Sequence, residues 1–184
     1  MSVLTVANQL TLLRMLLIPA LVILVVYGLN GWALIVLIAA GLTDALDGIL
    51  ARWWGQRTTL GALLDPMADK LLLISTFVVL TIPSLDLPNR LPIWLTVLVI
   101  SRDVIIVVTV AIVNLSIGRR TFKPTLLGKL ATLVYLLTAA VTMYFNWLGR
   151  PSALVDVAIY ATLGVTLVSG LHYIAHASRV LNDV

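Results

Sequence analysis

Apolar residues follow one another along this chain in six long runs, separated by short groups of Gly, Pro, Asn or charged residues. A helix needs about 20 mainly apolar residues to cross a bilayer, so each run is long enough to predict a transmembrane helix. The predicted spans are Leu10–Tyr27, Trp32–Trp53, Gly61–Ile82, a fourth that follows Pro92 and ends near Ile117, Pro124–Trp147, and a sixth that follows Pro151 and ends near Tyr173.

Composition agrees with this pattern. The 184 residues are 61% hydrophobic and only 11% charged, with a mean hydropathy of +1.10, which excludes an ordinary soluble domain. No stretch is polar and long enough to form a second domain. The sequence therefore predicts an all-α integral membrane protein with one membrane-embedded domain over residues 1–184.

The position of the cations predicts the orientation of the spans. The ends of the chain and the loops after spans two and four carry Arg52, Arg57, Arg119, Arg120, Lys123 and Arg179, whereas the opposite side carries Arg90 and Arg150. Because cytoplasmic loops are rich in Lys and Arg, both termini are expected in the cytoplasm or an equivalent compartment. A bacterial cytoplasmic membrane or a mitochondrial-type inner membrane is the expected location.

Several classes of protein are excluded or disfavoured. The chain has no cysteine, so it has no disulfide and no thiolate metal site. The N-terminus lacks a basic segment and a small-residue cleavage site, which indicates a retained first span and no cleaved signal peptide. Basic and aromatic residues do not alternate as in a nucleic-acid groove, so no nucleic-acid partner is expected.

The segment Asp44–Asp69 is the most unusual part of the sequence. It holds four of the eight acidic residues, set between apolar runs. An aspartate at the centre of a membrane helix costs about 2.5–3.5 kcal/mol on insertion scales, so four of them need a partner. Divalent metal is the partner that best suits a group of carboxylates.

The spacing of these carboxylates predicts a phosphate-binding metal site. Asp44 and Asp47 nearly share one helix face, and Asp65 and Asp69 share another with Gly61. A short loop makes the two spans antiparallel neighbours, so the carboxylates meet near the cytoplasmic surface. Oxygen ligands without His or Cys suit Mg²⁺ or Mn²⁺, and two such ions can clamp the oxygens of a pyrophosphate. Arg52 and Arg57 can neutralise further phosphate charge.

The same residues fill the pattern D-x2-D-G-x2-A-R-x8-G-x3-D-x3-D without a gap. They are Asp44, Asp47, Gly48, Ala51, Arg52, Gly61, Asp65 and Asp69. This pattern resembles that of the CDP-alcohol phosphatidyltransferases, membrane enzymes that displace CMP from a CDP-linked lipid with an alcohol acceptor. The resemblance implies a core of six transmembrane helices, a two-metal site and a homodimer.

The resemblance also implies a role for each motif residue. Asp44, Asp47 and Asp65 would bind the metal pair, and Asp69 would be both a ligand and the general base. The CDP-lipid would be bound by Asp47, Gly48, Ala51, Arg52 and Gly61, in which the small residues leave room for the nucleotide and the arginine meets its phosphates.

Three other interpretations compete with an enzyme. The aspartates could be helix caps or buried ion-pair partners, and the glycines could merely pack helices. Intramembrane aspartates also line cation transporters, but there polar residues are spread over the membrane depth, whereas here they gather at one end of two spans. A non-catalytic assembly protein would have no need of the aspartates.

Weaker resemblances concern the acceptor. Asn8–Arg14 resembles the N-x-L-T-x-x-R opening of the family, with Ala7 where a proline is frequent. Leu64–Lys70 resembles the L-D-P-x-A-D-K form of the phosphatidylglycerol phosphate synthases and eukaryotic-type cardiolipin synthases. Ile100–Val104 and the K-P-T segment at Lys123 resemble the cardiolipin synthases more closely. These segments favour phosphatidylglycerol as the acceptor, with glycerol-3-phosphate as the alternative.

Arg102 is expected in the middle of the fourth span, where an unpaired cation is costly. We expect it to bind the phosphate of the acceptor together with Lys123 and Lys129. The alternative is a structural pair between Arg102 and Asp103 or a motif aspartate. The cations of the basic loop, residues 118–123, can also be explained by the orientation of the spans alone.

Overall fold

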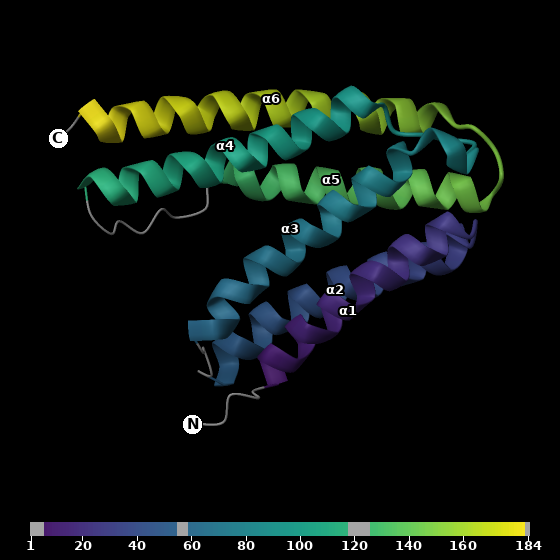
Figure 1. Cartoon of the computed structure of the whole chain (residues 1–184), viewed down its shortest axis with the longest axis horizontal. Helices are drawn as coiled ribbons and strands as arrows, with labels where there is room; N and C mark the ends of the chain where they lie inside the picture. The colour runs from purple at the N-terminus through teal and green to yellow at the C-terminus, as the bar shows by residue number, and fades with distance from the viewer. Residues whose placement is uncertain (1–5, 55–58, 118–125, 183–184) are drawn as a thin grey trace. The chain divides into compact units, whose positions relative to one another are not determined.

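The computed structural model describes residues 6–54, 59–117 and 126–182, with side chains described for Gln9 and for residues 11–43, 67–109 and 126–175. Over these residues the chain forms six α-helices and one short 3-10 helix, with no strand (Figure 1). The elements are α1 (Val6–Val26), α2 (Asn30–Trp54), α3 (Thr59–Thr81), η1 (Pro83–Leu85), α4 (Ile93–Ile117), α5 (Leu126–Trp147) and α6 (Ala153–Asn182).

The predicted all-helical fold and the number of helices are confirmed, and most boundaries agree within a few residues. The largest difference is at the C-terminus, because α6 continues to Asn182 and does not end near Tyr173. The residues after Tyr173 include the polar His176, Ser178 and Arg179 but no Gly or Pro, so nothing in this segment breaks the helix.

Two glycines end helices in the same way. Gly28 has φ +73° and Gly149 has φ +67°, a left-handed conformation that glycine adopts without steric cost. After α1, Leu29 N donates to Leu24 O (2.8 Å) and Gly28 N donates to Val25 O (3.0 Å). These are the two hydrogen bonds of a Schellman motif. Gly28 thus ends α1 and allows the chain to turn into α2.

The helices belong to two compact units. The first comprises residues 1–90 and 139–151, and the second comprises residues 91–138 and 152–184, so α5 contributes to both. In the first unit, α1 packs along both α2 and α3 (Figure 1). Its core is apolar, with buried side chains at helical spacing: Leu21 and Val25 on α1, Ala33, Leu37 and Ala40 on α2, and Ala68, Leu72, Phe77 and Leu80 on α3.

A pair of asparagines joins the end of α5 to the segment before α4. Asn89 N donates to Asn146 Oδ1 (2.8 Å), and Asn146 Nδ2 donates to Asn89 O (3.0 Å). Asn89 Nδ2 also donates to Arg150 O (2.9 Å). Both asparagines are buried, so their amides satisfy backbone groups that the loops would otherwise leave without partners.

The second unit buries hydroxyl groups and exposes large apolar side chains. In it, α4 packs against α6. Thr138 and Thr162 share a hydrogen bond of 2.7 Å, and Tyr135 and Thr166 share one of 2.8 Å. By contrast, the apolar side chains on the outside of α6 include Val157, which is 63% exposed, and Leu171, which is 68% exposed. This arrangement is typical of helices that contact lipid, where buried hydroxyls bind neighbouring helices.

Among the described residues, two helical segments are long and apolar enough to cross a membrane. They are Leu126–Trp147 and Ala153–Ala175, while Thr11–Val26 and Asn30–Thr43 are apolar but shorter. These two segments support a location in the membrane, but they do not test the predicted six spans.

Candidate active site

The motif aspartates lie at matching heights on two consecutive helices. Along α2, Asp47 and Asp44 precede Trp54 by seven and ten residues, which is about 10 and 15 Å at 1.5 Å per residue. Along α3, Asp65 and Asp69 follow Thr59 by six and ten residues, about 9 and 15 Å. Only four residues join the two helices, and such a connection spans at most about 19 Å. The backbone therefore keeps the two pairs at similar distances from the connected ends.

The structure does not describe the side chains of most residues predicted for the site. The structure places the backbone of the following on helices without describing their side chains: Asp44, Asp47, Gly48, Ala51 and Arg52 on α2, and Gly61 and Asp65 on α3. Lys123 lies outside the described residues altogether. Their predicted roles remain predictions.

Asp69 is the motif residue whose side chain is described, and it is bound by a buried arginine. Nη1 of Arg14, on α1, donates to Asp69 Oδ1 at 2.7 Å. The Arg14 side chain has no solvent exposure, whereas 34% of the Asp69 side chain is exposed. The guanidinium therefore contacts the carboxylate from the protein interior, and part of the Asp69 side chain remains accessible.

The pair joins two helices that are distant in sequence. Arg14 lies 55 residues before Asp69, and α1 packs along α3 over this region. A charge-assisted hydrogen bond of this length restricts the rotation of the carboxylate, because the guanidinium has a fixed planar geometry. Thr11, one turn before Arg14, is also fully buried. Arg14, in the segment that resembles the opening of the family, thus contacts Asp69 directly.

No role was predicted for Arg14 from the sequence. The sequence already indicated that Arg14 needs a partner, because it is the one cation in the first predicted span. A cation among apolar residues needs a partner, which is the argument already applied to Arg102. What the sequence could not supply was which of eight acidic residues is that partner.

Arg102 is also buried, but it is bound within the second unit. Its Nη1 donates to Asp103 Oδ1 at 2.7 Å, and its Nε donates to Ser169 Oγ, on α6, at 3.0 Å. Its Nη2 also contacts Ser169 Oγ. This is the structural pairing that the sequence analysis gave as the alternative. A cavity of about 210 Å³ borders the same arginine and is lined in part by Ser101, Thr166 and Gly170.

Lys129 lies in the first turn of α5 with an exposed side chain. It is in the second unit, as is Arg102. The exposed side chain could contact an acceptor phosphate, and this contact stays a prediction.

No group of three or more potential metal ligands occurs among the described side chains. Three of the four predicted ligands are not among these side chains, so the metal hypothesis rests on the chemistry of the donor set. Four carboxylates without His or Cys fit Mg²⁺ or Mn²⁺. The accessible part of the Asp69 carboxylate is compatible with this assignment.

Comparison with known proteins identifies relatives over most of the chain. Residues 4–169 match the family model described as CDP-alcohol phosphatidyltransferase. The chain is similar to a protein of Streptomyces coelicolor named cardiolipin synthase (CMP-forming), with 34% identity over 97% of this chain and 85% of the relative. It is also similar to a probable phosphatidylglycerophosphate synthase of Mycobacterium tuberculosis, with 32% identity over 97% of this chain and 84% of the relative.

A human relative is named cardiolipin synthase (CMP-forming) and is 36% identical over 76% of this chain and 50% of its own length. Both kinds of name therefore occur among relatives of similar identity. The match of the family model over most of the chain, with the complete aspartate motif on two consecutive helices, establishes that this protein belongs to the CDP-alcohol phosphatidyltransferase family.

Proposed function

We propose that this protein transfers a phosphatidyl group from CDP-diacylglycerol to a hydroxyl group of a glycerol-containing acceptor and releases CMP. The observation that carries the proposal is the complete eight-position motif in a chain that the family model matches over residues 4–169. The names of the relatives support the same reaction class, since they include CMP-forming cardiolipin synthases.

In this reaction the acceptor hydroxyl oxygen forms a bond to the phosphorus of the phosphatidyl group. The bond between that phosphorus and the bridging oxygen of the pyrophosphate breaks, and its electron pair leaves with CMP. The proton of the attacking hydroxyl passes to the carboxylate of Asp69. A general base in this role must lie within hydrogen-bond reach of the hydroxyl and be held in one orientation. The contact with Arg14 supplies that orientation.

Asp44, Asp47, Asp65 and Asp69 are the residues that would hold one or two Mg²⁺ or Mn²⁺ ions. Bound ions of this kind neutralise pyrophosphate oxygens and stabilise charge on the leaving group. Gly48, Ala51 and Gly61 leave space beside the nucleotide, and Arg52 pairs with its phosphates. Asp47 contributes to the same CDP-lipid site.

We further propose that the six helices all span the membrane and form one domain over residues 1–184. The exposed apolar side chains and buried hydroxyls of the second unit support this arrangement. The distribution of Lys and Arg favours termini and an active site on the cytoplasmic side, in a bacterial cytoplasmic membrane or a mitochondrial-type inner membrane. A homodimer is proposed from the family resemblance.

For the acceptor we favour phosphatidylglycerol, with glycerol-3-phosphate as the alternative. Arg102, Lys123 and Lys129 are proposed to bind its phosphate. Arg102 follows Ile93 by nine residues and precedes Ile117 by fifteen, so it lies about 22 Å from the end of α4 that leads to the basic loop. A phosphate would reach it through the 210 Å³ cavity, where it would compete with Asp103 for the guanidinium.

The test offers both acceptors to the purified protein together with CDP-diacylglycerol and Mg²⁺ or Mn²⁺. We expect CMP release that depends on metal and acceptor, with cardiolipin as the main lipid product. Phosphatidylglycerol phosphate as the main product would favour the alternative acceptor. Failure to release CMP with either acceptor, in a protein that binds CDP-diacylglycerol, would contradict the proposed function.

A further inference from the structure

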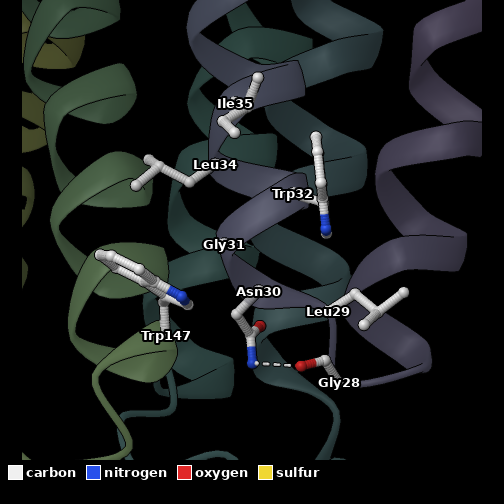
Figure 2. A pocket seen from close by; sticks show the side chains of 8 residues that line it. All are labelled: Gly28, Leu29, Asn30, Gly31, Trp32, Leu34, Ile35 and Trp147. Carbon is white, nitrogen blue, oxygen red and sulfur yellow. Dashed lines mark hydrogen bonds between the residues drawn. The ribbon is translucent and has the colours of Figure 1, made fainter.

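A cavity of about 470 Å³ lies at the turn between α1 and α2, entirely within the first unit. It is lined by residues 28–32, Leu34, Ile35 and Trp147 (Figure 2). Asn30 precedes Asp44 by fourteen residues of the same helix, about 21 Å. The cavity is therefore separate from the proposed active site and lies at the opposite end of α2.

Asn30 lines the cavity, and its side-chain oxygen Oδ1 accepts no hydrogen bond from the described residues. The residue is only 7% exposed, and its Oδ1 is buried without a hydrogen-bond partner. Its Nδ2 donates to Gly28 O at 3.4 Å, which fixes the amide so that the oxygen lies on the other side (Figure 2). A buried acceptor of this kind is unfavourable unless a donor reaches it, and Asn30 lines the cavity, from which a donor can approach.

The start of α2 lies at the same cavity. Asn30, Gly31 and Trp32 are the first three residues of the helix, and all three line the cavity. The first N–H groups of a helix have no acceptor inside the helix, and together with the helix dipole they favour an anion such as phosphate. The cavity therefore suits a ligand that carries an anionic acceptor and, close to it, a donor.

The walls suit an amphiphile. Trp32 is 64% exposed and Trp147 is 60% exposed, and their indole rings stand on two sides of the cavity (Figure 2). Exposed Leu29 and Ile35 continue the apolar surface. Tryptophan prefers the level of the lipid head groups, with its ring in the apolar phase and its N–H near water.

Gly31 keeps this cavity open beside Trp147. A Cβ atom on Gly31 would lie 2.7 Å from Cδ1 and 2.8 Å from Nε1 of the Trp147 ring, closer than two such atoms can approach. A larger residue at position 31 would displace the indole that forms one wall.

We propose that this cavity binds the head group of a phospholipid in which an N–H or O–H donor follows the phosphate. The phosphate contacts the first N–H groups of α2, the donor binds Asn30 Oδ1, and the acyl chains leave along Leu29 and Ile35. Phosphatidylethanolamine and phosphatidylglycerol both have this chemistry, whereas phosphatidylcholine has the phosphate but no such donor. The proposal rests on the proposed membrane topology and not on the proposed reaction.

The test is native mass spectrometry of the delipidated full-length protein in detergent, titrated separately with short-chain forms of these three lipids. We expect at least a fivefold tighter binding of phosphatidylethanolamine than of phosphatidylcholine. Asn30→Ala should reduce this ratio to about one. Gly31→Ala should weaken the binding of both lipids while leaving Asn30 in place. Gly164→Ala, at which an added Cβ meets nothing within 4 Å, is the matched control and should behave as the unchanged protein.

Phosphatidylethanolamine is the decisive ligand, because phosphatidylglycerol can also occupy the proposed active site as an acceptor. The phosphatidylglycerol titration then shows whether a hydroxyl replaces the ammonium. Equal binding of phosphatidylethanolamine and phosphatidylcholine, or a preference that survives Asn30→Ala, would overturn the proposal and leave water as the partner of Asn30. If Asn30→Ala does not fold, unchanged binding in Gly31→Ala overturns it instead. CMP release measured on the same samples tests the reaction separately.

Discussion

Among the described side chains, two buried arginines bind carboxylates, and their surroundings differ in a way that bears on function. Arg14 reaches from α1 to Asp69 on α3, 55 residues away, and its partner belongs to the aspartate motif. Arg102 binds the adjacent Asp103 and Ser169 of α6, neither of which is in the motif. Asp69 is 34% exposed, whereas the Asp103 side chain is 12% exposed.

This difference indicates two kinds of ion pair. A buried cation must be neutralised in either case, because an uncompensated charge is costly in a membrane protein. In the Arg102 region the neutralising carboxylate of Asp103 is largely closed to solvent. In the Arg14 region the neutralising carboxylate is accessible and is also the proposed base. Arg14 thus contacts the proposed base, whereas Arg102 is paired with residues outside the motif.

The largest effect is expected for Asp69→Asn. Loss of the base should lower kcat by about 10²–10⁴-fold, while binding of CDP-diacylglycerol changes little. The measurement is CMP release together with lipid binding by the purified variant. Asp86→Asn is the control, because Asp86 is exposed and has φ +45°, a conformation that asparagine tolerates. Normal turnover by Asp69→Asn would show that the base is assigned wrongly.

A smaller effect is expected when Arg14 is replaced. Arg14→Met removes the group that orients Asp69 and should lower kcat by about 10–100-fold, with a nearly unchanged KM for CDP-diacylglycerol. Arg14→Lys keeps the charge but loses the planar guanidinium, so it should recover only part of the rate. The loss of folding stability should fall below the roughly 3–5 kcal/mol of a fully buried pair, because Asp69 is partly exposed.

The double variant Arg14→Met/Asp69→Asn separates positioning from stability. If Arg14 acts through Asp69, the double variant should be no slower than Asp69→Asn alone. Two independent losses of rate that multiply in the double variant would contradict a positioning role. A reduced melting temperature with unchanged kcat in Arg14→Met would show that the pair is only structural.

The smallest effect is expected at Ser169, and it tests the Arg102 region. Ser169→Ala removes a hydroxyl that contacts two nitrogens of Arg102 and should destabilise the protein by about 1.5–3 kcal/mol. If Arg102 binds the acceptor, the KM for phosphatidylglycerol should change several-fold while the KM for CDP-diacylglycerol stays constant. Thr138→Val is the matched control, since it removes a hydrogen bond to Thr162 and should cost only about 0.6 kcal/mol.

A thermal shift in Ser169→Ala with both KM values unchanged would favour the structural pairing of Arg102 over acceptor binding. A shift in the KM of CDP-diacylglycerol would contradict both interpretations of this region.

The sequence alone determined the number of helices, most of their boundaries and the family. These features depend on local properties: the length of apolar runs, the glycines at residues 28 and 149, and the fixed spacing of the motif from Asp44 to Asp69. The tertiary structure alone decided the partner of Arg14, and it selected one of the two alternatives expected for Arg102. Hydropathy shows that Arg14 and Arg102 need a counter-charge, but only the packing of α1 along α3 selects Asp69 for Arg14. That choice depends on contacts between residues far apart in the chain, which no local pattern encodes.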